Sequence, residues 1–562
     1  MTHLGCSLGR LGSPVSIVLG VLSLLVVVAA PAGAAPQQVP AFPGGVELVR
    51  IDAVVLDPDG RPVKGLTAAD FEVLENGKRR EVASFEPIDV RPQPSPDPAA
   101  PAVPEKESAP RVLLPQEGRA VLVYFDDIHV QAENAVLVRS TLAPFLSREL
   151  RPGDAVTIVA PEQGLWWTAR TAWEQAQLPS VVERLRGQYV PDPFGDYVTD
   201  WLVMQHVEYG NVMVTSSTGV DPARASQPTS SGSLLKDAEE PRAVSIKEQE
   251  RYGLALLRIQ RSLKGLQRAI ESLAGFRGRK SVVIYSEGFI LSSVLQDYNR
   301  VIDLCRRANV ALYVADPRGL RAGSVTTAAR GTALGTDMIL PGTAYSAESA
   351  GSTHIALATG GAAYEGNDIN EAMARVLEES AAYYLIGFQP AEGPAGERKL
   401  AVRVRGKDLR VRARSRYFAG SLPDTLGDAA PVRAARELSD RADVPIRVAT
   451  VPGGEAGAVE LRLWLEPVQP ARERALKLLV EARPLAGGEL VHDLANLTVP
   501  AATAPQGVRR QLRLTPGVWQ ARVVVTDTST GAVGSALHTF EVLTRAASPL
   551  GSAGDATRTD SR

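Results

Sequence analysis

The stretch Arg119-Ala-Val-Leu-Val-Tyr-Phe-Asp-Asp-Ile-His-Val130 decides how the rest of the chain is interpreted. Its residues 120–125 form an unbroken apolar run rich in β-forming side chains, which predicts a strand buried on both faces inside a parallel sheet. The run ends in Asp126 and Asp127. Because ligands of open α/β sheets bind beyond the carboxyl ends of the strands, these two carboxylates are candidates for a binding site. They are equally consistent with residues that begin a loop or cap the helix that follows.

The composition of the whole chain indicates a multidomain globular protein. Its 562 residues are too many for one core, and 44% hydrophobic and 22% charged residues are ordinary proportions. The formal net charge is −2, so no basic excess suggests nucleic acid as a partner. Only Cys6 and Cys305 are present, and Cys305 lies in an amphipathic pattern that predicts a small core residue.

The first 34 residues have the pattern of a secretory signal peptide. Arg10 precedes an apolar segment at 15–30, and Ala32-Gly33-Ala34 is a small-residue cleavage site. A retained membrane anchor is the alternative, but the apolar segment is short for a span and no cationic residue follows it directly. We therefore expect an exported mature chain without a transmembrane segment, located in the periplasm, outside the cell or at the cell envelope.

The segment before the central strand predicts a small β unit followed by a linker. Residues 46–90 contain strand patterns separated by turn residues, as in a β-sandwich-like unit. Residues 91–117 are rich in proline and alanine, which predicts an extended linker.

Residues 118–418 alternate strand and helix patterns, as a mainly parallel α/β domain does. An insertion at 188–245 interrupts this alternation. Its aromatic side chains are either a partner-binding surface or a local small core; they are Tyr189, Phe194, Tyr197, Trp201 and Tyr209. Regularly spaced strand patterns at 444–543 predict an Ig-like β-sandwich, and 544–562 predict a disordered tail.

Four stretches in this order resemble a known family. They are Val54–Gly77, Gly278–Phe289, Asn309–Leu320 and Tyr383–Phe388, with the strand that ends at Asp126 between the first two. Together they are similar to the von Willebrand factor type A-related family of exported bacterial proteins, best known from Acidobacteria. The resemblance covers about residues 46–418 and implies a Rossmann-like A-type domain.

The resemblance also implies a metal-ion-dependent adhesion site. In A-type domains, Mg²⁺ is held by an Asp-x-Ser-x-Ser motif after the first strand, by a threonine and by a later aspartate, through hard oxygen ligands. With Asp126 in the first position, Ile128 and Val130 stand in the serine positions. Neither side chain can bind a metal, which predicts a degenerate site.

The alternative alignment starts the motif at Asp127. His129 and Gln131 then stand in the serine positions, and imidazole is a poor ligand for a hard cation. Glu287 stands where the later aspartate is expected. The candidate ligand-binding rim, and the candidate metal ligands, are thus Asp126, Asp127 and Glu287.

No catalytic motif accompanies this rim. The chain contains no Gly-x-Ser-x-Gly, His-Glu-x-x-His, phosphate-binding loop or Cys-x-x-Cys, and Ser286 lacks the preceding glycine of a nucleophile elbow. We therefore expect a non-enzymatic interaction protein that binds a protein or a surface ligand. The alternatives are an exported hydrolase and a structural spacer of the cell envelope.

Overall fold

The computed structural model describes most of the chain from residue 48 to residue 543. The described ranges are 48–89, 119–190 without 152, residue 207, 246–288 without 274, 275, 277 and 278, 295–319, 351–419 without 365 and 395, and 434–543 without 454 and 456. The predicted signal peptide, Pro-rich linker, C-terminal tail and most of the insertion at 188–245 lie outside these ranges. Among the described helices, none is both long enough and apolar enough to span a membrane.

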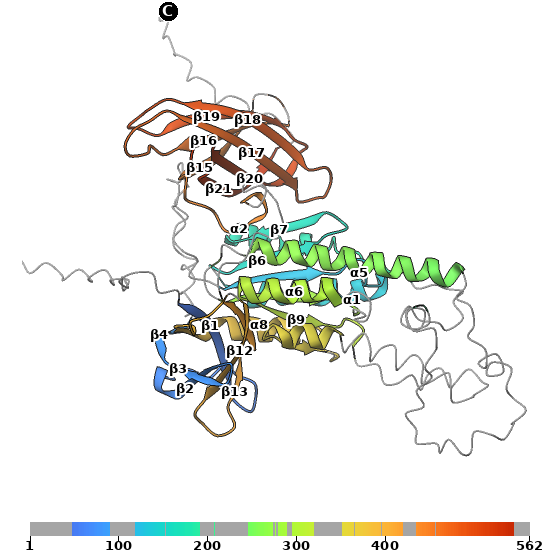
Figure 1. Ribbon diagram of the computed structural model, residues 1–562. Helices are drawn as coiled ribbons and strands as arrows, with labels where there is room; N and C mark the ends of the chain where they lie inside the picture. The colour runs from blue at the N-terminus through green and yellow to red at the C-terminus, as the bar shows by residue number, and fades with distance from the viewer. Residues whose placement is uncertain are drawn as a thin grey trace, which may run out of the picture. The chain divides into compact units, whose positions relative to one another are not determined.

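A six-stranded sheet forms the centre of the α/β domain (Figure 1). Its strands, in spatial order, are β10 (Ala363–Tyr364), β9 (Val310–Ala315), β8 (Lys280–Tyr285), β5 (Ala120–Phe125), β6 (Ala155–Ala160) and β7 (Leu165–Ala169). All neighbours are parallel except β6 and β7, and β7 is an edge strand. The predicted mainly parallel α/β sheet is confirmed.

Helices cover both faces of this sheet, so it is doubly wound (Figure 1). One core joins the sheet to α1 (Ala132–Glu149), α3 (Leu178–Val182) and α8 (Glu371–Ala381), and the short α2 (Ala172–Ala176) follows β7. The other core joins it to α5 (Ile246–Ser272), α6 (Leu295–Ala308) and the helical residues 351–358. Cys305 of α6 is buried in this second core, as its amphipathic pattern predicts.

Strand β5 shows why its sequence is continuously apolar. Val121, Val123 and Phe125 point into the core with α1, whereas Leu122 and Tyr124 point into the core with α5. Since successive side chains of a strand point to opposite faces, a strand covered on both sides has no position for an exposed polar residue.

A β-sandwich precedes and follows the α/β domain in the chain. One sheet has the order β13-β1-β11-β4 and the other has the order β14-β12-β2-β3. The N-terminal segment contributes β1 (Val49–Leu56), β2 (Phe71–Glu75), β3 (Lys78–Arg80) and β4 (Val82–Asp89). Residues after the α/β domain contribute β11 (Ala382–Phe388), β12 (Gly396–Val404), β13 (Arg410–Arg412) and β14 (Arg416–Ala419).

The structure therefore divides the chain differently from the sequence-based boundaries at 46–90 and 118–418. β11 lies between β1 and β4, so residues 382–419 belong to the N-terminal sandwich and not to the α/β domain. Asp89, at the end of β4, pairs with Ala382, at the start of β11, so the two ends of the inserted α/β domain meet. A strand pattern in a sequence indicates a strand but not the strand with which it pairs. Here β1 and β4 pair with β11, which lies about three hundred residues later in the chain.

A buried charge network holds the two halves of this sandwich together. The carboxylate of Glu75 accepts hydrogen bonds from Arg398 Nη1 at 2.7 Å, Arg80 Nε at 2.6 Å and Tyr417 Oη at 2.5 Å. Burial alone would raise the pKa of Glu75, but these hydrogen bonds and one from the Ala391 N–H outweigh it and lower the pKa to about 2. Glu75 is thus a buried anion that binds strands from both chain segments.

The C-terminal residues form a second two-sheet β-sandwich. Its sheets have the orders β15-β16-β19 and β18-β17-β20-β21, and leucine and valine side chains of both sheets share one core. The strands are β15 (Ile446–Pro452), β16 (Ala458–Leu465), β17 (Arg474–Pro484), β18 (Val491–Val499), β19 (Gln506–Arg513), β20 (Gly517–Asp527) and β21 (Val533–Val542). The strand pairings among its described residues are antiparallel, so the β class predicted for residues 444–543 is confirmed.

Candidate functional site

The predicted site residues lie at the carboxyl ends of β5 and β8, which are parallel neighbours. Phe125 pairs with Tyr285 in the last register position, so Asp126 and Ser286 leave the sheet side by side. The helices that follow these strands, α1 and α6, pack on opposite faces of the sheet. The two strand ends therefore flank the topological switch point, where doubly wound folds bind ligands.

Asp126 lies at the centre of this edge and is fully buried. Its Oδ2 accepts a hydrogen bond from Ser286 Oγ at 2.8 Å and lies 2.9 Å from His129 Nδ1. Its Oδ1 is buried and has no hydrogen-bond partner among the described residues. An unpaired buried carboxylate oxygen costs free energy, so Asp126 is the one expected site residue whose contacts within the chain are incomplete.

Asp127 is also buried, but it contacts the turn between β6 and β7. Its Oδ2 accepts hydrogen bonds from the Gln163 N–H at 2.8 Å and from Gln188 Nε2 at 3.3 Å, and its Oδ1 lies 3.4 Å from the Glu162 nitrogen. Burial raises the pKa of Asp127 from 3.8 to about 6, although the hydrogen bonds from Gln163 oppose this and the nearby Asp126 adds to it. Asp127 is thus a structural acceptor for the neighbouring loops.

Glu287 binds the amino end of α1. Its Oε1 accepts hydrogen bonds from the Gln131 N–H at 2.6 Å and from Asn134 Nδ2 at 2.7 Å, and its Oε2 accepts one from Gln131 Nε2 at 2.9 Å. Gln131 is the residue that precedes the first turn of α1. A carboxylate there satisfies free N–H groups and interacts favourably with the helix dipole.

The three carboxylates share an edge of the sheet, but their hydrogen bonds lead in three directions. Asp127 and Glu287 bind protein donors through both oxygens, so Asp126 Oδ1 is the one rim carboxylate oxygen without a hydrogen bond among the described residues. Val130, in one of the two serine positions, is a core residue. In the described part of the chain, no three His, Cys, Asp or Glu side chains are arranged to hold a metal. Mg²⁺ requires near-octahedral oxygen coordination, so these residues do not fit the metal that the family resemblance implies.

Ser286 and His129 were not among the expected ligand-binding residues, yet both contact Asp126. The pairing of β5 with β8 in parallel register is the signal that places Ser286 beside Asp126. Ser286 donates its hydroxyl hydrogen to a carboxylate and accepts a hydrogen bond from the Gly288 N–H. In a Ser-His-Asp arrangement the serine hydroxyl is directed to histidine, whereas the Ser286 hydroxyl is directed to the Asp126 carboxylate.

Exposed hydrophobic side chains flank the same edge of the sheet. Tyr189 pairs with Gln131 in an isolated parallel bridge, and Arg258 of α5 lies 5.3 Å from the centre of its ring. The next residue, Val190, is 79% exposed. Large hydrophobic residues are also exposed in the first two turns of α1 and within one turn of Arg258 on α5; they are Val136, Leu137, Leu254 and Leu257.

Comparisons with known proteins do not identify a family for this chain. No family model and no curated protein matches this chain. Among solved structures, an E. coli curli protein, CsgC, matches 18% of this chain and 97% of its own, with 16% identity and a TM-score of 0.13. Two Bacteroides uniformis β-glucuronidase structures, one with a covalently bound aziridine, each match 29% of this chain with TM-scores of 0.15 and identities of 12% and 11%. This chain covers only 19% of the glucuronidase chains, and at such TM-scores these likenesses carry no statement about fold or function.

Proposed function

We propose that this chain is an exported, non-enzymatic interaction protein whose α/β domain is of the von Willebrand factor A type. The motifs quoted above support the domain type, and the doubly wound sheet with an antiparallel edge strand agrees with it. The N-terminal pattern at 1–34 supports export. The hydrogen bond from Ser286 to Asp126 instead of to a histidine supports a role without catalysis of the Ser-His-Asp type.

We propose that a protein partner binds at the carboxyl edge of the sheet. The observation that carries this proposal is the set of exposed hydrophobic residues on both sides of Tyr189, with Val190 the most exposed. Large aliphatic side chains that stay exposed at Val190, near the amino end of α1 and on α5 are candidates for contact with a protein partner.

Binding in this proposal does not use a resident metal ion. The adhesion site is degenerate: the positions that would supply hydroxyl ligands are Ile128 and Val130, and Glu287 caps α1. The partner would instead contact aliphatic side chains, while the hydrogen bond from Ser286 to the buried Asp126 holds the two strand ends together. If no partner binds at this edge, the alternative is that the chain is a structural spacer of the cell envelope.

Site-specific crosslinking tests the proposal. A photoreactive phenylalanine analogue is placed at position 190, and in a second protein at position 494, a similarly exposed leucine of the C-terminal sandwich. Both full-length proteins are irradiated with native cell envelope in the presence of EDTA. We expect a discrete crosslinked product from position 190 only. Identical products from both positions, or none from position 190, would favour the spacer.

A further inference from the structure

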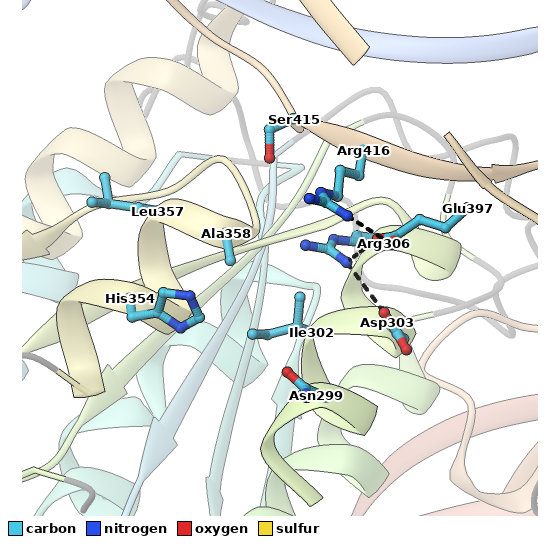
Figure 2. A pocket seen from close by; sticks show the side chains of 10 residues that line it. All are labelled: Asn299, Ile302, Asp303, Arg306, His354, Leu357, Ala358, Glu397, Ser415 and Arg416. Atoms are coloured by element: carbon cyan, nitrogen blue, oxygen red, sulfur yellow. Dashed lines mark hydrogen bonds and ion pairs between the residues drawn. The ribbon is translucent and has the colours of Figure 1, made fainter. Parts of the chain in front are cut away.

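A cavity of about 640 Å³ lies at the other end of the α/β domain, between α6, the helical residues 351–358 and strands of the N-terminal sandwich (Figure 2). It is lined by Arg306 near the end of α6, and β9 begins at Val310, so the cavity is near the amino ends of the strands. Asp126 lies at the carboxyl ends. The volume is within the range of small-molecule sites.

One wall of the cavity is a chain of four charged side chains (Figure 2). Glu397 bridges two guanidinium groups: its Oε1 lies 2.6 Å from Arg306 Nη1, and its Oε2 lies 2.9 Å from Arg416 Nη1. Arg306 Nη1 also contacts Asp303 Oδ1 at 3.2 Å. The four formal charges cancel, so this wall has little net attraction for an anion or a cation.

The same wall retains unused hydrogen-bonding capacity. Each guanidinium group carries five N–H donors, and both arginines bind carboxylates through Nη1 alone. The Arg306 side chain is 15% exposed and that of Arg416 is 42% exposed, so Arg416 presents more of its remaining N–H donors to the cavity. Asp303 contacts Arg306 through Oδ1, and its side chain is 48% exposed, so this carboxylate can also accept a hydrogen bond from a ligand. A ligand that both donates and accepts hydrogen bonds matches this wall.

The opposite wall is mainly apolar. Ile302 of α6 and Ala358 form its base, and Leu357 is 61% exposed at its mouth. His354 lies beside them, with its ring stacked on Tyr298 at 5.9 Å and an interplanar angle of 18°. The Tyr298 hydroxyl donates to the Gly351 carbonyl oxygen, which fixes the helical residues 351–358 against α6.

We propose that this cavity binds a neutral sugar unit of a glycan. A sugar ring presents hydroxyls that donate and accept at its edge, which suits the Arg306, Glu397 and Arg416 wall, and C–H groups on its faces, which suit Ile302 and Leu357. A free anion would suit two arginines without carboxylates, and a purely apolar ligand would cover the remaining N–H donors of the arginines without accepting from them. This site is separate from the proposed protein-binding edge and does not depend on it.

Saturation-transfer difference NMR on the full chain tests this assignment. The probes are neutral disaccharides built from glucose, galactose or N-acetylglucosamine, with the corresponding hexuronic acids as a second panel. The test variant is Leu357→Asp combined with Asn299→Ala, both at exposed lining positions, and the matched control is Leu494→Asp in the C-terminal sandwich. We expect a neutral disaccharide to give signals that the test variant weakens about tenfold or more and the control leaves unchanged.

A second variant separates a sugar site from a structural charge cluster. Glu397→Gln removes one negative charge and leaves the wall with a net charge of +1, so preference should shift from the neutral sugar toward its uronic acid. Absence of any saccharide signal, equal signals from the test variant and the wild type, or binding of uronic acids alone by the wild type would each overturn the proposal.

Discussion

Glu287 Oε1 accepts a hydrogen bond from the backbone N–H of Gln131 at 2.6 Å, so the carboxylate in the position of a metal ligand binds the start of a helix. We expect Glu287→Gln to lower the free energy of unfolding by about 1–2 kcal/mol, since it weakens a charged acceptor at the end of α1. Denaturant unfolding measures this. The matched control is Glu133→Gln, an exposed acidic residue in the first turn of α1. Equal effects of the two variants would contradict the capping role.

Asp127 should make stability depend on pH. Its pKa of about 6 in the folded chain exceeds its ordinary value of 3.8, so the folded state binds this proton more tightly than the unfolded state. Stability from this group is therefore greatest at low pH and falls as pH rises from about 4 to about 6, by a total on the order of 3 kcal/mol. We expect Asp127→Asn to become more stable relative to wild type across that interval, measured by urea unfolding. A difference that does not change with pH would contradict the burial argument.

Residues 46–90 should not fold alone, because β1 needs β11 and β13 as neighbours. A fragment of these residues should give an NMR spectrum with the narrow amide dispersion of an unfolded chain. Asp89 and Ala382 are paired, so a two-residue Asn-Gly turn can join 48–89 directly to 382–419. We expect this fusion to show the dispersion of a folded β protein. A folded 46–90 fragment, or an unfolded fusion, would show that the sandwich is divided differently.

The donor geometry at the rim predicts no metal site. We expect calorimetric titration of Mg²⁺, Mn²⁺ or Ca²⁺ into residues 35–562 to give no saturable heat, because Asp126 Oδ1 is the one rim carboxylate oxygen that lacks a protein donor among the described residues. Asp126→Asn serves as the control. Saturation at one site that this variant abolishes would restore the metal-dependent adhesion site.

The central strand was predictable to the residue because a strand buried on both faces must be apolar throughout, and Ala120–Phe125 is. The end of this apolar run also predicted that Asp126 lies at the carboxyl end of the strand. The roles of Asp127 and Glu287 could not be predicted, because their hydrogen-bond donors Gln163 and Gln131 lie on other elements. Nothing in the sequence around either carboxylate indicates these partners.

The division of the sandwich was not predictable for a related reason. The run Tyr383–Phe388 indicates a strand, but it does not indicate that β1 and β4 are its neighbours. Long-range pairing depends on how the faces of β1 and β11 fit each other, and hydrophobic periodicity in one sequence does not contain that information.

The most direct measurement compares partner capture by wild type and by Val190→Asp combined with Leu257→Asp, with Leu494→Asp as the matched surface control. All three replace exposed side chains, so the fold should be retained, which circular dichroism checks. With the crosslinker at Tyr189 and EDTA present, we expect the double variant to lose the discrete product about tenfold or more and the control to keep it. An undiminished product from the double variant, or a product that appears only when Mg²⁺ is added, would contradict metal-independent protein binding at this edge.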